Sequence, residues 1–270
     1  MALTPFQRDV CRLLAAERRA HGESYVAGGV ALSVALNYAR LSRDVDLFHD
    51  TVEAVARSWD RDRLALAAAG YRVQSIRERP GYVEAAVSRG DGQLVIEWAR
   101  DSAFRFFPLV EHEELGLTLH PFDLATNKVL ALVGRLEVRD WVDVIACDER
   151  VQPLGYLAWA ACGKDPGFTP RGILEQARRS ARYSDDEVSA LAFEGVAPAA
   201  AELSRRWHEA LDAADAILAR LPAAHVGEAV LTSDGRWCTA DIAALDVALA
   251  EDRVMFHRGS IGGALPHVKR

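Results

Sequence analysis

The spacing of apolar residues changes near residue 120, and this change restricts the fold more than any other feature of the chain. Before it, several short apolar segments alternate in steps of two, as half-buried strands do, with helical patterns between them. After it, apolar residues recur every three or four positions, which is typical of amphipathic helices. The sequence therefore predicts an α+β protein: a mixed sheet flanked by helices in residues 1–120, then a helical region in residues 121–270.

Local signals place the elements of the N-terminal half. A helix over 5–21 follows the N-cap residue Thr4 and ends at Gly22. Two further helices are expected over 30–40 and 51–69, and strands over 24–27, 44–48, 71–76, 82–87 and 93–98. The turn Arg89-Gly90-Asp91-Gly92 joins the last two strands as a hairpin.

Helical spacing dominates the C-terminal half, first over 124–136 and 139–147 and then from Pro153 onward. Glycine and proline interrupt it at 163–170, 195–198 and 221–227. The tail after Val226 fits no single pattern, so its structure stays open.

Composition excludes some functions. Half of the 270 residues are hydrophobic and 26% are charged, which is an ordinary globular balance. The formal net charge of −7 argues against a long nucleic-acid footprint, although a local basic groove remains compatible with it. The C-terminal half does contain a basic cluster, which is either an RNA-phosphate contact or a solvated helix face: Arg171, Arg178, Arg179 and Arg182.

The four cysteines show no Cys-x-x-Cys spacing, so we expect reduced, buried thiols and no zinc site. No apolar run approaches the roughly 20 residues that cross a bilayer, so no membrane contact is expected. The N-terminal residues lack the basic-then-apolar layout of a secretory signal. These observations predict a cytoplasmic protein.

Two acidic residues stand two positions apart in a short predicted strand, at Asp44 and Asp46. Side chains at this spacing share one face of a strand, where two carboxylates repel each other unless a cation lies between them. Such a pair suits Mg²⁺ or Mn²⁺, which take oxygen ligands and hold substrate phosphates. Taken alone, the pair is also compatible with a solvated turn.

A glycine pair, Gly28-Gly29, lies about fifteen residues upstream, at a strand-to-helix junction. Without Cβ atoms, the backbone N–H groups there can approach a phosphate at the positive end of a helix. A simple tight turn is the alternative. Together the glycine pair, the helix and the acidic strand predict a phosphate pocket that faces a metal site.

Glu97 is the candidate for a third acidic ligand, because it stands in the otherwise apolar strand Leu94-Val95-Ile96-Glu97-Trp98. An edge-strand residue paired with Arg100 or Arg105 is an equally compatible interpretation. Asp101 is a weaker substitute for it.

The segment from Gly28 to Phe48, with its Arg43-Asp44-Val45-Asp46-Leu47 core, resembles the first motif of the DNA polymerase β-like nucleotidyltransferases. It is most similar to the AbiEii/MenT branch, which contains toxins of type IV toxin–antitoxin systems. A second block resembles a later motif of that branch: Asp123-Leu124-Ala125-Thr126-Asn127-Lys128, then Arg135, then Arg139-Asp140-Trp141-Val142-Asp143. The two motifs together cover roughly residues 22–148.

The resemblance implies a polymerase β-like fold and transfer of an NMP from an NTP to an acceptor hydroxyl. The acceptor would be a tRNA 3′ end, a protein or a small molecule, and a cognate antitoxin is a possible partner. Asp44, Asp46 and Glu97 would hold Mg²⁺ or Mn²⁺. The nucleotide would contact Gly28, Gly29, Arg43 and Lys128, and Asp140 would act in the active site or position Lys128.

Alternatives remain open at both motifs. Lys128 and Arg135 lie along one helical stripe, which could face phosphate or form a solvated face with Asp123 and Glu137 as partners. The family usually has Gly-Ser where this chain has Gly-Gly, so Ser33 or Ser42 would have to supply a hydroxyl. A catalytically inactive nucleotide-binding or interaction protein that keeps the fold is therefore the second hypothesis.

Overall fold

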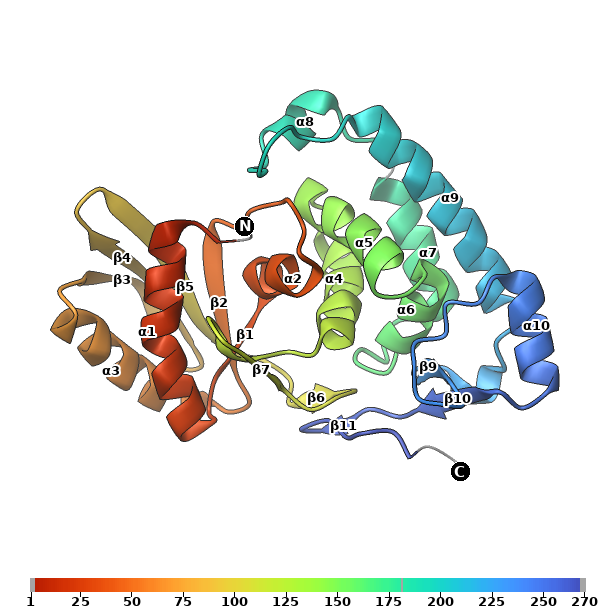
Figure 1. The fold of residues 1–270 in the computed structure, drawn as a ribbon, viewed down its shortest axis with the longest axis horizontal. Helices are drawn as coiled ribbons and strands as arrows, with labels where there is room; N and C mark the ends of the chain where they lie inside the picture. Colours follow the sequence, from red (N-terminus) through yellow and green to blue (C-terminus); the bar gives the residue numbers. More distant parts are fainter. Residues whose placement is uncertain (1–2, 181, 268–270) are drawn as a thin grey trace. The chain divides into compact units, whose positions relative to one another are not determined.

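The computed structural model describes residues 3–180 and 182–267, so the first two residues of the segment inspected for a targeting signal lie outside it. The chain forms two compact units (Figure 1). The first contains Met1–Ala103, Leu109–His120 and Ala192–Gly195, and the second contains Phe104–Pro108, Pro121–Leu191 and Val196–Arg270.

A seven-stranded mixed sheet forms the centre of the first unit, in the order β3-β4-β5-β2-β1-β8-β7. The pairs β2–β5 and β1–β8 are parallel, and the other neighbours are antiparallel. The strands are β1 (Tyr25–Ala27), β2 (Asp44–His49), β3 (Arg72–Arg79), β4 (Tyr82–Arg89), β5 (Gly92–Arg100), β7 (Val110–His112) and β8 (Gly116–Thr118). The mixed sheet flanked by helices confirms the predicted fold class.

Three helices accompany this sheet: α1 (Pro5–His21), α2 (Gly28–Leu36) and α3 (Val52–Ala68). A capping box between Thr4 and Gln7 begins α1, and Gly22 ends it in the left-handed conformation, as its sequence predicts. The prediction that the second helix reaches residue 40 is wrong. Asn37 adopts φ 45° and its N–H contacts the carbonyls of Ser33 and Val34, which ends α2 at Leu36.

The two faces of the sheet differ. Val45 and Leu47 of β2 are buried on the face that α1 and α3 cover, and so are Ile96 and Trp98 of β5 (Figure 1). The Trp98 indole N–H donates to Asp62 of α3 at 2.7 Å, which fixes α3 on this face. The residues between them in β2 and β5 are half-buried on the opposite face.

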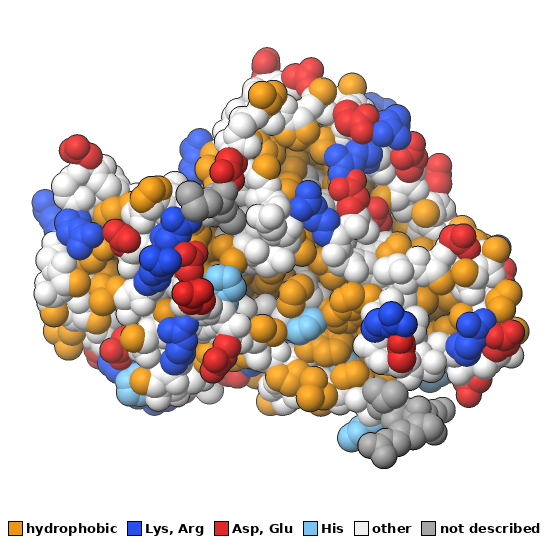
Figure 2. Space-filling view, viewed as in Figure 1, with side chains coloured by type: hydrophobic (Ala, Val, Ile, Leu, Met, Phe, Trp, Pro, Cys, Tyr) orange, Lys and Arg blue, Asp and Glu red, His pale blue; other side chains and the backbone are white. Residues whose placement is uncertain are grey.

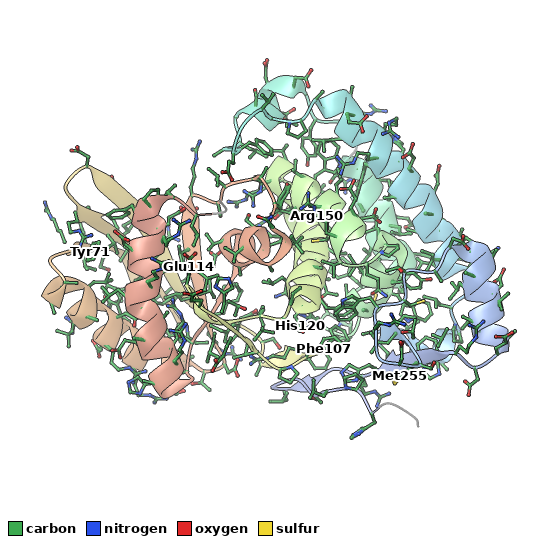
Figure 3. All side chains as sticks on the ribbon, viewed as in Figure 1. Tyr71, Phe107, Glu114, His120, Arg150 and Met255 are labelled. Atoms are coloured by element: carbon green, nitrogen blue, oxygen red, sulfur yellow. The ribbon has the colours of Figure 1, made fainter. Side chains whose placement is uncertain are left out.

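The exposed side of α1 carries mixed charges. Arg8 and Arg12 both pair with Glu114, which precedes β8 and is labelled in Figure 3. Acidic and basic side chains lie side by side along this helix (Figure 2). No large field of one sign results from them there.

A short segment from the C-terminal half of the sequence completes the first unit. Phe193 forms an antiparallel bridge with Arg40, and the carbonyl of Ala192 accepts the N–H of Leu41 at 2.8 Å. The N–H of Glu194 donates to the carbonyl of Ala39 at 2.7 Å. We call Ala192–Gly195 the strap, because it holds the loop that follows α2.

Helices make up most of the second unit, which confirms the predicted helical C-terminal half. They are α4 (Pro121–Arg135), α5 (Val138–Arg150), α6 (Leu154–Ala161), α7 (Pro170–Ala177), α8 (Asp185–Ser189), α9 (Ala200–Leu218) and α10 (Ile242–Ala250), with short 3₁₀ helices at Arg178–Ser180 and Ala223–His225. The tail after Val226 forms a hairpin of β9 (Ala229–Thr232) and β10 (Val254–His257). It then adds β11 (Ser260–Ile261), which pairs with β6 (Phe104–Arg105).

The phenylalanine-rich segment at 104–108 is packed inside the second unit. The carboxylate of Asp123 accepts the N–H groups of Phe106 and Phe107 at 2.8 and 3.0 Å and pairs with Lys164 at 2.8 Å. Phe107, labelled in Figure 3, lies edge-on to Phe122, with ring centroids 5.6 Å apart. These contacts explain why this segment belongs to the second unit although it precedes β7.

The cysteines are free and buried, as the sequence predicts. Burial raises the pKa of the Cys11 thiol to about 11, so it stays protonated at neutral pH. In the described ranges 3–180 and 182–267, none of the helices is both long and apolar enough to cross a bilayer.

Candidate active site

Three predicted metal ligands lie on one face of two adjacent strands. In β2, Asp44 and Asp46 are half-buried and alternate with the buried Val45 and Leu47, so both aspartates point away from α1 and α3. The parallel register places Asp46 opposite Glu97 of β5. Because paired residues of neighbouring strands face the same side, Glu97 joins the two aspartates on what we call the acidic face.

The next strand extends the acidic face with two residues that sequence reasoning missed. Glu84 of β4 is the antiparallel partner of Glu97, and the Tyr82 hydroxyl hydrogen-bonds with Glu97. Burial and then the nearby charges of Glu97 and Glu84 raise the pKa of Tyr82 to about 12. Both residues occupy alternate positions of the predicted strand 82–87, and this alternation was the only local signal for them.

The glycine turn lies directly against the acidic face. Gly28 begins α2 with φ +63°, a conformation that side chains rarely tolerate. A Cβ atom on Gly28 would lie only 1.6 Å from Oδ2 of Asp46. Glycine is required here on both grounds, and its absent side chain is what lets the Asp46 carboxylate reach the backbone of the turn.

Gly29 makes room for two other side chains. A Cβ atom there would lie 2.6 Å from the Ser42 hydroxyl oxygen and 2.8 Å from a terminal nitrogen of Arg40. Of the two serines considered from the sequence, Ser42 is therefore the one at the turn, whereas Ser33 is buried and donates to the carbonyl of Arg40 at 2.7 Å. Arg43, a predicted nucleotide contact, is exposed.

The donor set fits a hard divalent cation that is shared with a substrate. Within the described part of the chain, no group of three His, Cys, Asp or Glu side chains could hold a metal ion by itself. Mg²⁺ does not require such a group, because it is usually bound through one or two carboxylates and completes its shell with water and substrate phosphates. Carboxylates beside a backbone turn without Cβ atoms match that requirement. Metal binding stays a prediction.

Lys128 lies in an ion-pair cluster of the second unit. Only 7% exposed, its ammonium contacts fully buried carboxylates of Asp143 at 2.9 Å and Asp140 at 3.2 Å. Arg135 also donates to both oxygens of Asp140, at 2.6 and 2.9 Å. Burial alone would raise the pKa of Asp140, but the bonds from Arg135 and the charge of Lys128 hold it below its usual range.

The partners of this stripe therefore differ from the expected Asp123 and Glu137. Asp123 binds Lys164 instead, and only Glu137 comes within 4.0 Å of Arg135. Two cations and two anions cancel in the cluster, so Asp140 does position Lys128, as one of the two expected roles requires. A contact between Lys128 and the triphosphate stays a prediction.

The basic cluster of the C-terminal half is interspersed with acids. Arg171 and Arg178 line a hollow of about 280 Å³ together with Glu175 and Asp215. Arg178 pairs with Asp215, and Arg179 donates to Gln176 at 2.9 Å. This arrangement fits the solvated-face interpretation at least as well as an RNA contact.

No known family model and no curated protein sequence matches the chain. Two solved structures from Helicobacter pylori are similar to it. The protein JHP933 is 14% identical, with a TM-score of 0.52 over 80% of this chain and 91% of its own. A candidate nucleotidyltransferase is 12% identical, with a TM-score of 0.51 over 82% of this chain and 99% of its own.

At these identities the likeness concerns the fold alone. It spans both units and nearly the full length of each H. pylori protein. It also agrees with the seven-stranded mixed sheet and the helical region that follows it. The chain therefore has a nucleotidyltransferase fold.

Proposed function

We propose that the protein is a metal-dependent nucleotidyltransferase that transfers an NMP from an NTP to an acceptor hydroxyl. One observation carries this proposal: Asp44, Asp46 and Glu97 share the acidic face, and the Asp46 carboxylate lies against Gly28 of a backbone turn. Carboxylates and a Cβ-free turn side by side are what a metal–triphosphate complex needs. The nucleotidyltransferase fold supports the same reaction class.

In the proposed reaction, the acceptor oxygen forms a bond to the α-phosphorus of the NTP. The bond between that phosphorus and the oxygen bridging to the β-phosphate breaks, and pyrophosphate leaves with the electron pair. The proton of the acceptor hydroxyl passes to a carboxylate oxygen of the acidic face. Mg²⁺ or Mn²⁺ held by Asp44 and Asp46 with Glu97 would neutralise phosphate charge.

The finer assignment follows the resemblance of the two motifs to the AbiEii/MenT branch. On that basis the acceptor is a tRNA 3′ end, and the protein is the toxin of a type IV toxin–antitoxin pair. A protein or small-molecule acceptor would use the same acidic face. Gly28, Gly29, Arg43 and Lys128 are the proposed nucleotide contacts.

The experiment is incorporation of label from each of four α-labelled NTPs into a total RNA pool, with Mg²⁺ or Mn²⁺. We expect divalent-dependent incorporation that falls at least 100-fold in Asp46→Asn, because the substitution removes the charge beside the glycine turn. Asp60→Asn, an exposed aspartate of α3 paired with Arg63, is the matched control and should retain full activity. Equal incorporation by Asp46→Asn and the unaltered protein would contradict the assignment.

The inactive nucleotide-binding protein remains the second candidate. The observation in its favour is the cluster around Lys128, where two buried carboxylates already neutralise the ammonium. Stoichiometric NTP binding without label transfer to RNA, protein or small-molecule acceptors would select this candidate.

A further inference from the structure

The guanidinium of Arg40 lies at the glycine turn, where neither local spacing nor a motif drew attention to it. Arg40 is 4% exposed, and its terminal nitrogen would lie 2.8 Å from a Cβ atom on Gly29. The Ser42 hydroxyl oxygen would lie 2.6 Å from the same Cβ atom. The space that a side chain at residue 29 would fill is therefore lined by a cation and a hydroxyl group.

The surrounding backbone holds Arg40 in this place from two sides. Its carbonyl accepts the buried Ser33 hydroxyl at 2.7 Å, which ties the loop to α2. The strap brackets it on the other side, since Leu41 and Ala39 bond to Ala192 and Glu194. A loop residue with this many fixed neighbours presents its side chain in one orientation, which reduces the ordering cost of binding a ligand.

The charge of Arg40 fits a polyphosphate. A guanidinium beside a helix N-terminus is electrostatically unfavourable unless an anion is present, because the helix end is itself positive. Asp46 at Gly28 supplies one negative charge to the turn. An NTP would bring several more, and a planar guanidinium donates to phosphate oxygens in a paired geometry.

We propose that Arg40, assisted by the Ser42 hydroxyl, binds the triphosphate of the nucleotide at the Gly28–Gly29 turn. This inference rests on the proposed function, because the acidic face defines which side of the turn the nucleotide enters. Phosphate oxygens that accept the backbone N–H groups of the turn lie beside the guanidinium. The strap thereby links the C-terminal half of the sequence to nucleotide binding.

The test is the affinity for inorganic triphosphate, measured by titration calorimetry in EDTA. Arg40→Gln should bind about 10- to 100-fold more weakly, which is the effect of losing charge-assisted hydrogen bonds. Arg40→Lys keeps the charge with fewer fixed donors and should lie between the two. Arg63→Gln on α3, far from the turn in sequence and paired with Asp60, is the matched control and should bind normally.

A role of Arg40 in merely holding Asp46 predicts a different pattern. In that case the Arg40 variants would affect only divalent-dependent binding, and triphosphate affinity in EDTA would stay unchanged, which would overturn the proposal. Asp46→Asn should bind triphosphate in EDTA at least as tightly as the unaltered protein, because a repelling charge is removed. If Arg40→Gln fails to fold, Arg40→Lys decides by the same measurement.

The inference and the proposed function can fail separately. Arg40-dependent triphosphate binding without any label transfer would refute the enzyme and retain the binding role. Asp46-dependent transfer with an unchanged KM for NTP in Arg40→Gln would refute the binding role and retain the enzyme. Under the proposal, the Arg40 variants raise KM for NTP more than they lower kcat.

Discussion

Replacing Gly28 by alanine tests the geometry of the candidate site directly. Gly28 and Gly22 have nearly the same backbone conformation, with φ +63° and +64°. A Cβ atom on Gly22 would meet nothing within 4 Å, whereas one on Gly28 would lie 1.6 Å from Oδ2 of Asp46. Gly22→Ala is therefore a matched control that carries the backbone strain without the clash.

The expected magnitudes follow from these distances. Left-handed backbone costs a residue with a Cβ atom about 1–2 kcal/mol, and Gly22→Ala should lose that much unfolding free energy. In Gly28→Ala the oxygen of Asp46 must also move away by about 1.4 Å to reach 3.0 Å, below which Cβ contacts are essentially never seen. Overpacking of this kind adds about 1–3 kcal/mol. A 1 Å misplacement of a catalytic group can lower a rate about 100-fold, so transfer should fall by that factor.

The assay is urea unfolding of Gly28→Ala, Gly22→Ala and Asp46→Ala, and of Gly28→Ala combined with Asp46→Ala. Without the carboxylate, Gly28→Ala should cost no more than Gly22→Ala, because only the backbone strain remains. Label transfer is measured for the two glycine variants. The reasoning is refuted if Gly28→Ala costs the same in both backgrounds and transfers label as fast as Gly22→Ala.

Three further predictions concern buried charges. Burial raises the pKa of Asp62 to about 6 from an unfolded value of about 3.9, so its contribution to stability is lost as pH rises through that interval. Asp62→Asn should recover about 3 kcal/mol at pH 7 relative to pH 4 in urea titrations. Burial lowers the pKa of His49 to about 4, so stability should fall as pH drops from about 6.5 towards 4, and unfolding of His49→Gln should lack that loss. Asp140→Asn should lose about 3–5 kcal/mol, because Lys128 keeps one buried partner fewer, whereas Asp234→Asn at an exposed site should leave the urea midpoint unchanged.

Local patterns predicted most elements correctly because their causes are local. Thr4 caps α1 through a bond to the N–H of Gln7, only three residues away, and Gly22 ends the helix through its own backbone conformation. The period of two in β2 placed Asp44 and Asp46 on one face before any neighbouring strand was known. Errors arose where an element was very short: α2 stops at Asn37, and β6 and β11 have two residues each, too few for any periodicity.

Long-range contacts could not be predicted in the same way. The choice of β5 as the neighbour of β2 brings Glu97 beside Asp46, and the choice of β4 adds Glu84. The strap reaches the loop around Arg40 from more than 150 positions away, through backbone bonds that leave no trace in side-chain pattern. Lys128 similarly found its carboxylates on the next helix, at Asp140 and Asp143.

The amino-acid order by itself determined the secondary structure, the α+β class and the shared direction of Asp44 and Asp46, since these depend on neighbours within a few positions. Tertiary structure alone decided that Asp46 reaches the backbone of Gly28 and that Arg40 and Ser42 fill the space beside Gly29. It also decided that Lys128 is neutralised. Each of these outcomes depends on which distant segments pack together, and the free energy of that packing belongs to the whole fold rather than to any local pattern.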